Sequence, residues 1–160
     1  MGFRYAVIGA FGLHAYGLSR ATSDLDFVTE FPAQARLVPF LESLDYETLH
    51  LSTGYSNHLH ADPLMGRLDF VYVSGETSRR LFGSARIMLI MKGISLAVPR
   101  AEHLAAMKIQ AMKNDPQRTL QEMADIHFLL SLAEIDREEI KGYFEEQGMI
   151  EKYYEILKLL

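Results

Sequence analysis

The chain has 160 residues, of which 49% are hydrophobic and 23% charged, and its formal net charge is −5. These values are typical of a folded globular protein of one domain, and they exclude extensive intrinsic disorder. The chain contains no cysteine, which excludes disulfides, thiolate metal sites and a cysteine nucleophile. The net negative charge also argues against binding of long nucleic acids through bulk charge.

The N-terminal residues lack the pattern of a secretory signal peptide. The longest apolar stretches, such as Ala6 to Ala10 and Ile87 to Met91, are far shorter than the ~20 residues that span a bilayer. We therefore expect a cytoplasmic protein without a membrane segment.

Strands and helices are expected to alternate over the first two thirds of the chain. An apolar run over 4–8 predicts a buried strand, and a short helix over 10–16 follows it and stops at Gly17. A polar loop over 19–23 leads to the next strand. The remaining expected elements are strands over 24–29, 46–52, 55–60, 67–74, 85–92 and 94–98 and helices over 32–44 and 78–82.

From Pro99 onward the hydrophobic spacing is helical. The expected helices cover 100–113, 116–132, 136–147 and 149–160, with Asp115 and Asp136 as capping residues. The pattern favours an α+β fold, with a small mixed sheet, flanking helices and a C-terminal helical bundle. We expect a core over 1–98 and a helical region over 99–160, packed together as one compact unit.

The main chemical signal is the pair Asp24 and Asp26. These residues lie two apart on a predicted strand, so both carboxylates leave the same face while Leu25 and Phe27 point to the core. Two adjacent carboxylates on an apolar sheet repel each other and need a cation. Oxygen ligands at this spacing suit Mg²⁺ or Mn²⁺. The alternative is an exposed sheet edge or a strand cap.

Asp69 is the only charged residue within the apolar strand after Arg67. If this strand lies beside the first, Asp69 completes a cluster of three carboxylates able to hold two metals. The alternative for Asp69 is an ion pair with an arginine such as Arg20 or Arg67.

A glycine turn precedes the carboxylate pair. A strand that ends at Gly9 and a helix that begins near Ala10 direct backbone N–H groups towards an anion such as a phosphate. Arg20 and Thr22 lie in the loop before Asp24, where they either contact phosphate or form a solvated turn. We therefore expect Gly9, Ala10, Arg20 and Thr22 to be nucleotide-binding residues.

Lys108 places one ammonium on the apolar face of its predicted helix. It either reaches nucleotide phosphates, extends its head into water, or forms a structural pair with Asp125. His50, His58 and His60 are candidate metal ligands, but surface or packing roles are favoured for them.

The front of the chain resembles the polymerase-β-like nucleotidyltransferase superfamily, and its Arg-x-Thr-x-Asp-x-Asp form is similar to AbiEii-type toxins and related nucleotidyltransferase-like proteins. The motif consists of Gly9-Ala10-Phe11-Gly12-Leu13, Gly17 and Arg20-Ala21-Thr22-Ser23-Asp24-Leu25-Asp26-Phe27. The stretch from Glu102 to Ala111, with Asp125-Ile126 downstream, resembles the C-terminal helical motifs of that group.

The resemblance implies transfer of a nucleoside monophosphate from a nucleoside triphosphate to an acceptor hydroxyl on RNA, a protein or a small molecule. Asp24 and Asp26 would hold the metal–triphosphate, and Asp69 would bind a second metal and help to deprotonate the acceptor. Two departures are Ala10, where the family usually has Gly or Ser, and a missing basic–acidic pairing over Arg118 to Glu122. They keep open a weakly active or inactive module that binds nucleotide or a partner protein, as in a toxin–antitoxin pair.

Overall fold

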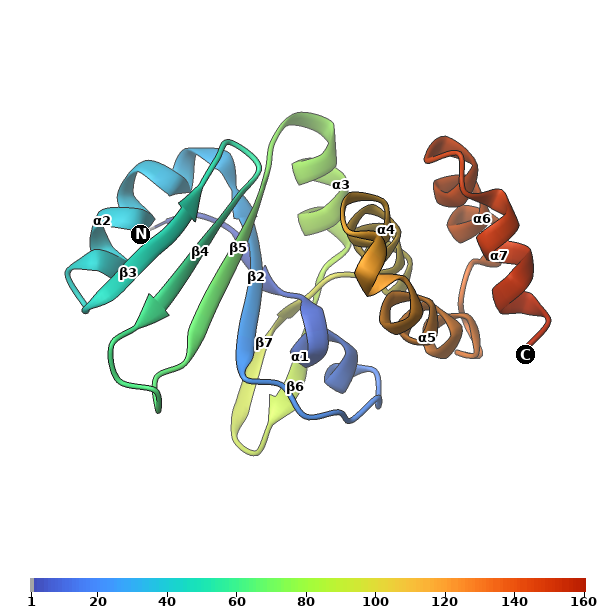
Figure 1. Ribbon diagram of the computed structural model, residues 1–160, viewed down its shortest axis with the longest axis horizontal. Coiled ribbons are helices and arrows are strands. Elements are labelled where there is room, and N and C mark those ends of the chain that lie inside the picture. The colour runs from blue at the N-terminus through green and yellow to red at the C-terminus, as the bar shows by residue number, and fades with distance from the viewer. Residues whose placement is uncertain (1) are drawn as a thin grey trace. The chain divides into compact units, whose positions relative to one another are not determined.

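The computed structural model describes residues 2–160. Contacts between residues divide the chain after Pro99 into two compact units. Strands and helices build the first unit, and helices alone build the second (Figure 1). The expected division after residue 98 lies one residue from this point.

The first unit contains a mixed five-stranded sheet in the order β1-β2-β5-β4-β3, together with the antiparallel hairpin β6-β7 (Figure 1). Strands β2 and β5 are parallel, and the other neighbours in the large sheet are antiparallel. The elements are β1 (Tyr5–Val7), α1 (Gly9–Ala15), β2 (Asp24–Glu30), α2 (Gln34–Glu42), β3 (Tyr46–Leu51), β4 (Tyr55–His60), β5 (Arg67–Val73), α3 (Gly75–Ser84), β6 (Arg86–Met91) and β7 (Ile94–Val98). The mixed sheet and the helices confirm the predicted α+β class.

One face of the large sheet packs against α2. Phe27 of β2 stacks on Phe70 of β5, with ring centroids 5.5 Å apart. Leu41 of α2 lies in the same buried cluster, and Leu37 packs against it. Because side chains alternate along a strand, the residues next to Phe27 and Phe70 in the sequence point to the opposite face.

The polar strands β3 and β4 are held by buried hydrogen bonds. The two ring nitrogens of His58 lie 3.2 Å from Thr48 Oγ1 and 2.8 Å from Ser56 Oγ. Ser56 Oγ lies 2.7 Å from the Tyr72 hydroxyl. Since these polar groups satisfy one another, His58 and Ser56 are fully buried without an unpaired donor or acceptor.

The second unit consists of α4 (Ala101–Asn114), α5 (Thr119–Leu130), α6 (Arg137–Glu146) and α7 (Ile150–Leu157). Both predicted caps are confirmed: Asp115 accepts a hydrogen bond from the Gln117 amide at 3.1 Å, and Asp136 accepts one from the Glu139 amide at 2.9 Å. Throughout residues 2–160, every helix is too short or too polar to cross a membrane.

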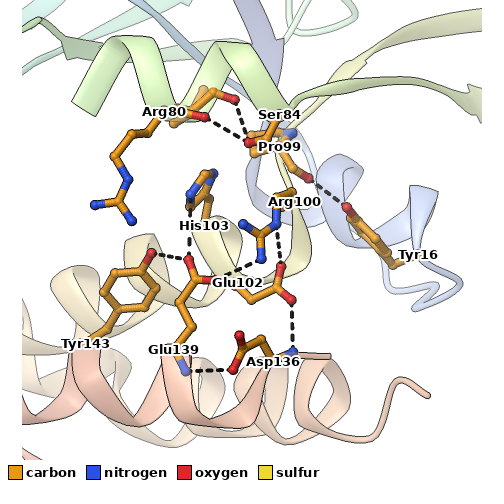
Figure 2. A network of polar contacts seen from close by, with 11 residues as sticks. Tyr16, Arg80, Ser84, Pro99, Arg100, Glu102, His103, Asp136, Glu139 and Tyr143 are labelled. Carbon is orange, nitrogen blue, oxygen red and sulfur yellow. Dashed lines mark hydrogen bonds and ion pairs between the residues drawn. The ribbon is translucent and has the colours of Figure 1, made fainter. Parts of the chain in front are cut away.

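A polar network joins the start of α4 to α6 (Figure 2). Arg100 forms ion pairs with Glu102 at 3.1 Å and with Glu139 at 2.8 Å. The other carboxylate oxygen of Glu102 accepts a hydrogen bond from the Asp136 amide at 3.0 Å. The Tyr143 hydroxyl donates to Glu139 at 2.6 Å. These contacts hold the first turn of α4 against α6.

Candidate functional site

The three predicted carboxylates share one face of the large sheet. In the parallel pairing of β2 with β5, Asp26 lies opposite Asp69 and Asp24 lies opposite Arg67. Side chains directly opposite each other on neighbouring strands point to the same face. Asp24, Asp26 and Asp69 therefore lie on the face away from the α2 core, and all three are partly exposed.

Gly9 lies directly against the carboxylate of Asp26. Its φ angle is +59°, and a Cβ atom added there would come within 1.9 Å of Asp26 Oδ2. The preceding amide of Ile8 donates to the Asp26 carbonyl at 2.9 Å. Glycine meets both requirements, a positive φ and the absence of a side chain. The turn after β1 therefore fixes the position of Asp26, while the neighbouring Ala10 is buried.

The loop before β2 is held by local hydrogen bonds. Thr22 Oγ1 donates to the Asp24 carbonyl and accepts from the Asp24 amide, both at 3.2 Å. Ser23 Oγ donates to Asp24 Oδ1 at 2.9 Å. His14 Nε2 lies 2.9 Å from the Arg20 carbonyl oxygen, so α1 anchors the loop. Thr22 and Ser23 thus position Asp24. Arg20 lies in the same loop, where its backbone carbonyl contacts His14.

Arg67 is a cation that lies among the carboxylates. Its Nε donates to Asp69 Oδ1 at 2.8 Å. This hydrogen bond raises the pKa of Arg67, as do the negative charges of Asp69, Asp24 and Asp26, whereas partial burial lowers it; the net shift is upward. The pairing of Asp69 with Arg67, left open from the sequence, is present in the structure.

Strand β4 adds Asn57, a residue that sequence reasoning missed. Asn57 lies opposite Asp69 and donates to Asp69 Oδ1 at 2.9 Å. His50 of β3 lies opposite Asn57, and its ring stacks on Tyr55 at 4.4 Å between centroids. The row from Asp26 through Asp69 and Asn57 to His50 crosses four strands. Asn57 in a polar strand gave no local signal, because its contact depends on the register between β4 and β5.

The donor set of this face fits one Mg²⁺ or Mn²⁺ better than two. Within residues 2–160, no three His, Asp or Glu side chains are grouped closely enough to hold a metal. Mg²⁺ is commonly held by one or two carboxylates together with water and substrate phosphates. Asp24 and Asp26 supply such a pair. Asp69 receives both of its hydrogen bonds on Oδ1, from Arg67 and Asn57, and its role as a second metal ligand stays a prediction.

His50, His58 and His60, which were weighed as metal ligands but favoured for surface or packing roles, do not form a group that could hold a metal in the described part of the chain. His58 is buried in the core network described above, whereas His50 lies on the opposite face of the sheet with Asn57. His60 accepts a hydrogen bond from the Asp62 amide at 2.8 Å. Burial lowers the pKa of His58, and the negative charges of Asp69 and Glu42 oppose this shift. These three histidines have packing and turn contacts, as the sequence analysis favoured.

In the second unit, Lys108 is held by two carboxylates. Its Nζ lies 2.7 Å from Asp125 Oδ2 and 2.9 Å from Glu122 Oε2, and its side chain is only 7% exposed. Glu122 also pairs with Arg118. The structural pair of Lys108 with Asp125, one of three alternatives, is therefore observed, and a nucleotide contact of Lys108 stays a prediction. The expectation that residues 118–122 lack a basic–acidic pairing was wrong, because Arg118 and Glu122 lie one helical turn apart.

No protein family and no curated protein matches the sequence. Several solved structures resemble the fold. The antibiotic-resistance factor ANT(2'')-Ia has a TM-score of 0.66 at 12% identity, over 98% of this chain and 86% of that one. An antigenic nucleotidyltransferase-like protein from Paracoccidioides brasiliensis has a TM-score of 0.54 at 16% identity, over 98% and 84%. The lincosamide antibiotic adenylyltransferase LnuA has a TM-score of 0.50 at 12% identity, over 92% of this chain and 87% of that one.

At identities this low, structural likeness establishes the fold and leaves the activity to be tested. The matches extend over both units of the chain. They do not bear on the finer likeness to AbiEii-type toxins, which stays a prediction. The glycine turn and the strand pair that carries the acidic residues are thus parts of a chain with the polymerase-β-like nucleotidyltransferase fold.

Proposed function

We propose that this protein is a metal-dependent nucleotidyltransferase, which moves a nucleoside monophosphate from a nucleoside triphosphate to an acceptor hydroxyl. The observation that carries the proposal is the parallel register of β2 and β5, with Asp26 opposite Asp69 and Asp24 two residues before Asp26. Three neighbouring carboxylates repel one another, and a divalent cation bound beside them would relieve that repulsion. The nucleotidyltransferase fold supports the same reaction class.

Each carboxylate has a distinct role in this proposal. Asp24 and Asp26 bind the metal–triphosphate, and the metal supplies charge neutralisation of the phosphates. Gly9 keeps the Asp26 carboxylate in place through the contact described above. Asp69 Oδ2 accepts the proton of the acceptor hydroxyl, since Oδ1 is held by Arg67 and Asn57. The acceptor oxygen then bonds to the α-phosphorus, the bond to the bridging oxygen breaks, and pyrophosphate leaves.

The acceptor is the open part of the proposal. RNA, protein side chains and small molecules all carry hydroxyl groups, and the net charge of −5 disfavours long polyanions. One neighbouring structure is ANT(2'')-Ia in complex with adenylyl-2''-tobramycin, which supports a small-molecule acceptor. A cytoplasmic location and a toxin–antitoxin partner stay predictions from the sequence.

The test is transfer of label from each of the four α-labelled nucleoside triphosphates, with Mg²⁺ or Mn²⁺, to RNA, to the protein itself and to hydroxyl-bearing small molecules. We expect one nucleotide to be transferred, and Asp26→Asn to lower the rate by at least about 100-fold, on the order of a lost catalytic electrostatic contact. Asp45→Asn is the matched control, because it makes the same chemical change at an exposed residue whose φ of 65° suits Asn. Equal rates for both variants would reject the proposal.

The second candidate is an inactive module that binds nucleotide. The ion pair of Arg67 with Asp69 favours it, because it engages the proposed proton acceptor. Calorimetry with ATP or GTP and Mg²⁺ separates the two functions. Binding that Asp26→Asn abolishes, without transfer to any acceptor, would establish the inactive module.

A further inference from the structure

Arg67 is a positively charged residue on the sheet face that carries Asp24, Asp26 and Asp69. It lies opposite Asp24 on the neighbouring strand, forms an ion pair with Asp69 at 2.8 Å, and interacts electrostatically with Asp26 as well. Two other arginines of this unit pair elsewhere, Arg4 with Glu30 and Arg79 with Glu76. Arg67 is therefore a built-in counter-ion of this cluster.

We propose that the Arg67 guanidinium competes with divalent metal for the three carboxylates, so that bare metal binds weakly and enters together with a nucleoside triphosphate. This inference rests on the proposed function, since it concerns the same carboxylates. It assigns Arg67 a positioning role, which links metal binding to nucleotide binding.

The charges explain the coupling. Arg67 neutralises part of the negative charge of the three carboxylates, and its guanidinium would repel a bare divalent cation held by Asp24 and Asp26. A metal–triphosphate complex carries net negative charge, so the guanidinium attracts it. Guanidinium groups also match phosphate oxygens with paired N–H donors. The same residue thus opposes free metal and favours metal that carries triphosphate.

The exposure of Arg67 makes this exchange possible. Its side chain is 38% exposed and that of Asp69 is 22% exposed. Partly exposed ion pairs are weak and reorganise without unfolding. Asn57 donates to the same oxygen of Asp69, so the carboxylate stays oriented when the guanidinium moves away.

The test measures Mn²⁺ binding by calorimetry and by electron paramagnetic resonance, with and without a nonhydrolysable triphosphate. For Arg67→Gln we expect bare Mn²⁺ to bind about tenfold more tightly than in the wild type, which corresponds to removal of one nearby like charge that is screened by a water-like dielectric. The triphosphate should then enhance Mn²⁺ affinity about tenfold less than in the wild type. Arg67→Lys retains the charge and should stay within about threefold of the wild type.

Arg86→Gln is the matched control, because it removes one positive charge from the exposed strand β6, and it should leave both affinities unchanged. Asp26→Asn added to Arg67→Gln should abolish the gain in bare Mn²⁺ affinity. If Arg67→Gln and the wild type bind bare Mn²⁺ equally while Asp26 is still required for the triphosphate complex, this inference fails and the proposed function survives. If neither protein shows Asp26-dependent binding, with or without triphosphate, the proposed function fails.

Discussion

Each unit of the molecule contains a cluster of carboxylates around one central cation, and the two clusters differ in exposure. In the helical unit, Lys108 is 7% exposed, and its partners Glu122 and Asp125 are 0% and 4% exposed. In the sheet unit, Arg67 and Asp69 are 38% and 22% exposed. The first cluster contains a closed set of ion pairs, whereas the second leaves carboxylate oxygens near solvent.

The comparison separates a structural role from the functional role proposed above. A buried charge is costly unless each group is paired, so removal of the Lys108 ammonium would take a charged partner away from two buried carboxylates. A partly exposed carboxylate is hydrated and loses little when its partner leaves. The same chemical groups therefore hold the fold together in one unit, and in the other they are the proposed ligand-binding groups.

The largest effect is expected for Lys108→Met. The substitution keeps much of the side-chain volume but leaves Glu122 and Asp125 without their shared cation, so we expect a loss of about 3–5 kcal/mol in the free energy of unfolding. Urea denaturation followed by circular dichroism measures it. Lys152→Met is the control, because it breaks an exposed pair with Glu155 and should cost under about 1 kcal/mol. Similar losses for both variants would contradict the structural role of the buried cluster.

A smaller effect is expected for Gly9→Ala, which tests the support of the sheet cluster. Gly9 and Gly75 have nearly the same φ angles, +59° and +58°, but a Cβ atom would meet Asp26 only at Gly9. We expect Gly75→Ala to cost about 1 kcal/mol from the left-handed backbone alone. Gly9→Ala should cost about 1–2 kcal/mol more, on the order of an overpacked contact.

The functional readout of this pair is nucleotide binding. Because the added methyl group displaces the Asp26 carboxylate, Gly9→Ala should weaken binding of Mg²⁺-ATP, while Gly75→Ala leaves it unchanged. Calorimetry on both variants measures the difference. Equal affinities would show that the position of Asp26 does not depend on this turn.

The smallest effect is the pH dependence of stability, which should differ between the units. Burial lowers the pKa of His58 from its ordinary 6.5. As the pH falls below about 6.5, the unfolded chain therefore takes up a proton that folded His58 does not, and the sheet unit loses stability.

In the helical unit, stability should change over a lower pH range, because Glu102 is a group that titrates there. Burial raises the pKa of Glu102, but hydrogen bonds from the backbone amides of Asp136 and Glu102 and the contact with Arg100 outweigh this effect. The pKa of Glu102 is therefore lowered from its ordinary value of 4.5. The contribution of ionised Glu102 to the stability of the helical unit is complete above about pH 4.5 and is lost as the pH falls further. Hydrogen exchange at pH 7, 5.5 and 4 should show protection declining first in β3 and β4 and later at the start of α4. Simultaneous loss would contradict this order.

Much of the fold followed from local patterns. The alternation over 24–29 and 67–74 predicted strands β2 and β5, and Asp115 and Asp136 were identified as caps because capping uses neighbours two or three residues away. The helix expected over 32–44 is shorter, since residues 31–33 form a 3₁₀ turn and α2 ends at Glu42. Boundaries depend on packing at the ends of an element, which a periodic pattern does not contain.

The carboxylate pair, the glycine turn and the α+β class were readable from residues a few positions apart, because strand alternation and turn geometry are short-range properties of the chain. The sequence also offered Arg67 as a partner of Asp69 and Asp125 as a partner of Lys108, but it did not indicate their further partners. Asn57 meets Asp69, and Glu122 meets Lys108, only after strands and helices have packed in one register. Whether a charged residue becomes a buried ion pair or an accessible ligand depends on burial, and burial is a property of the assembled structure.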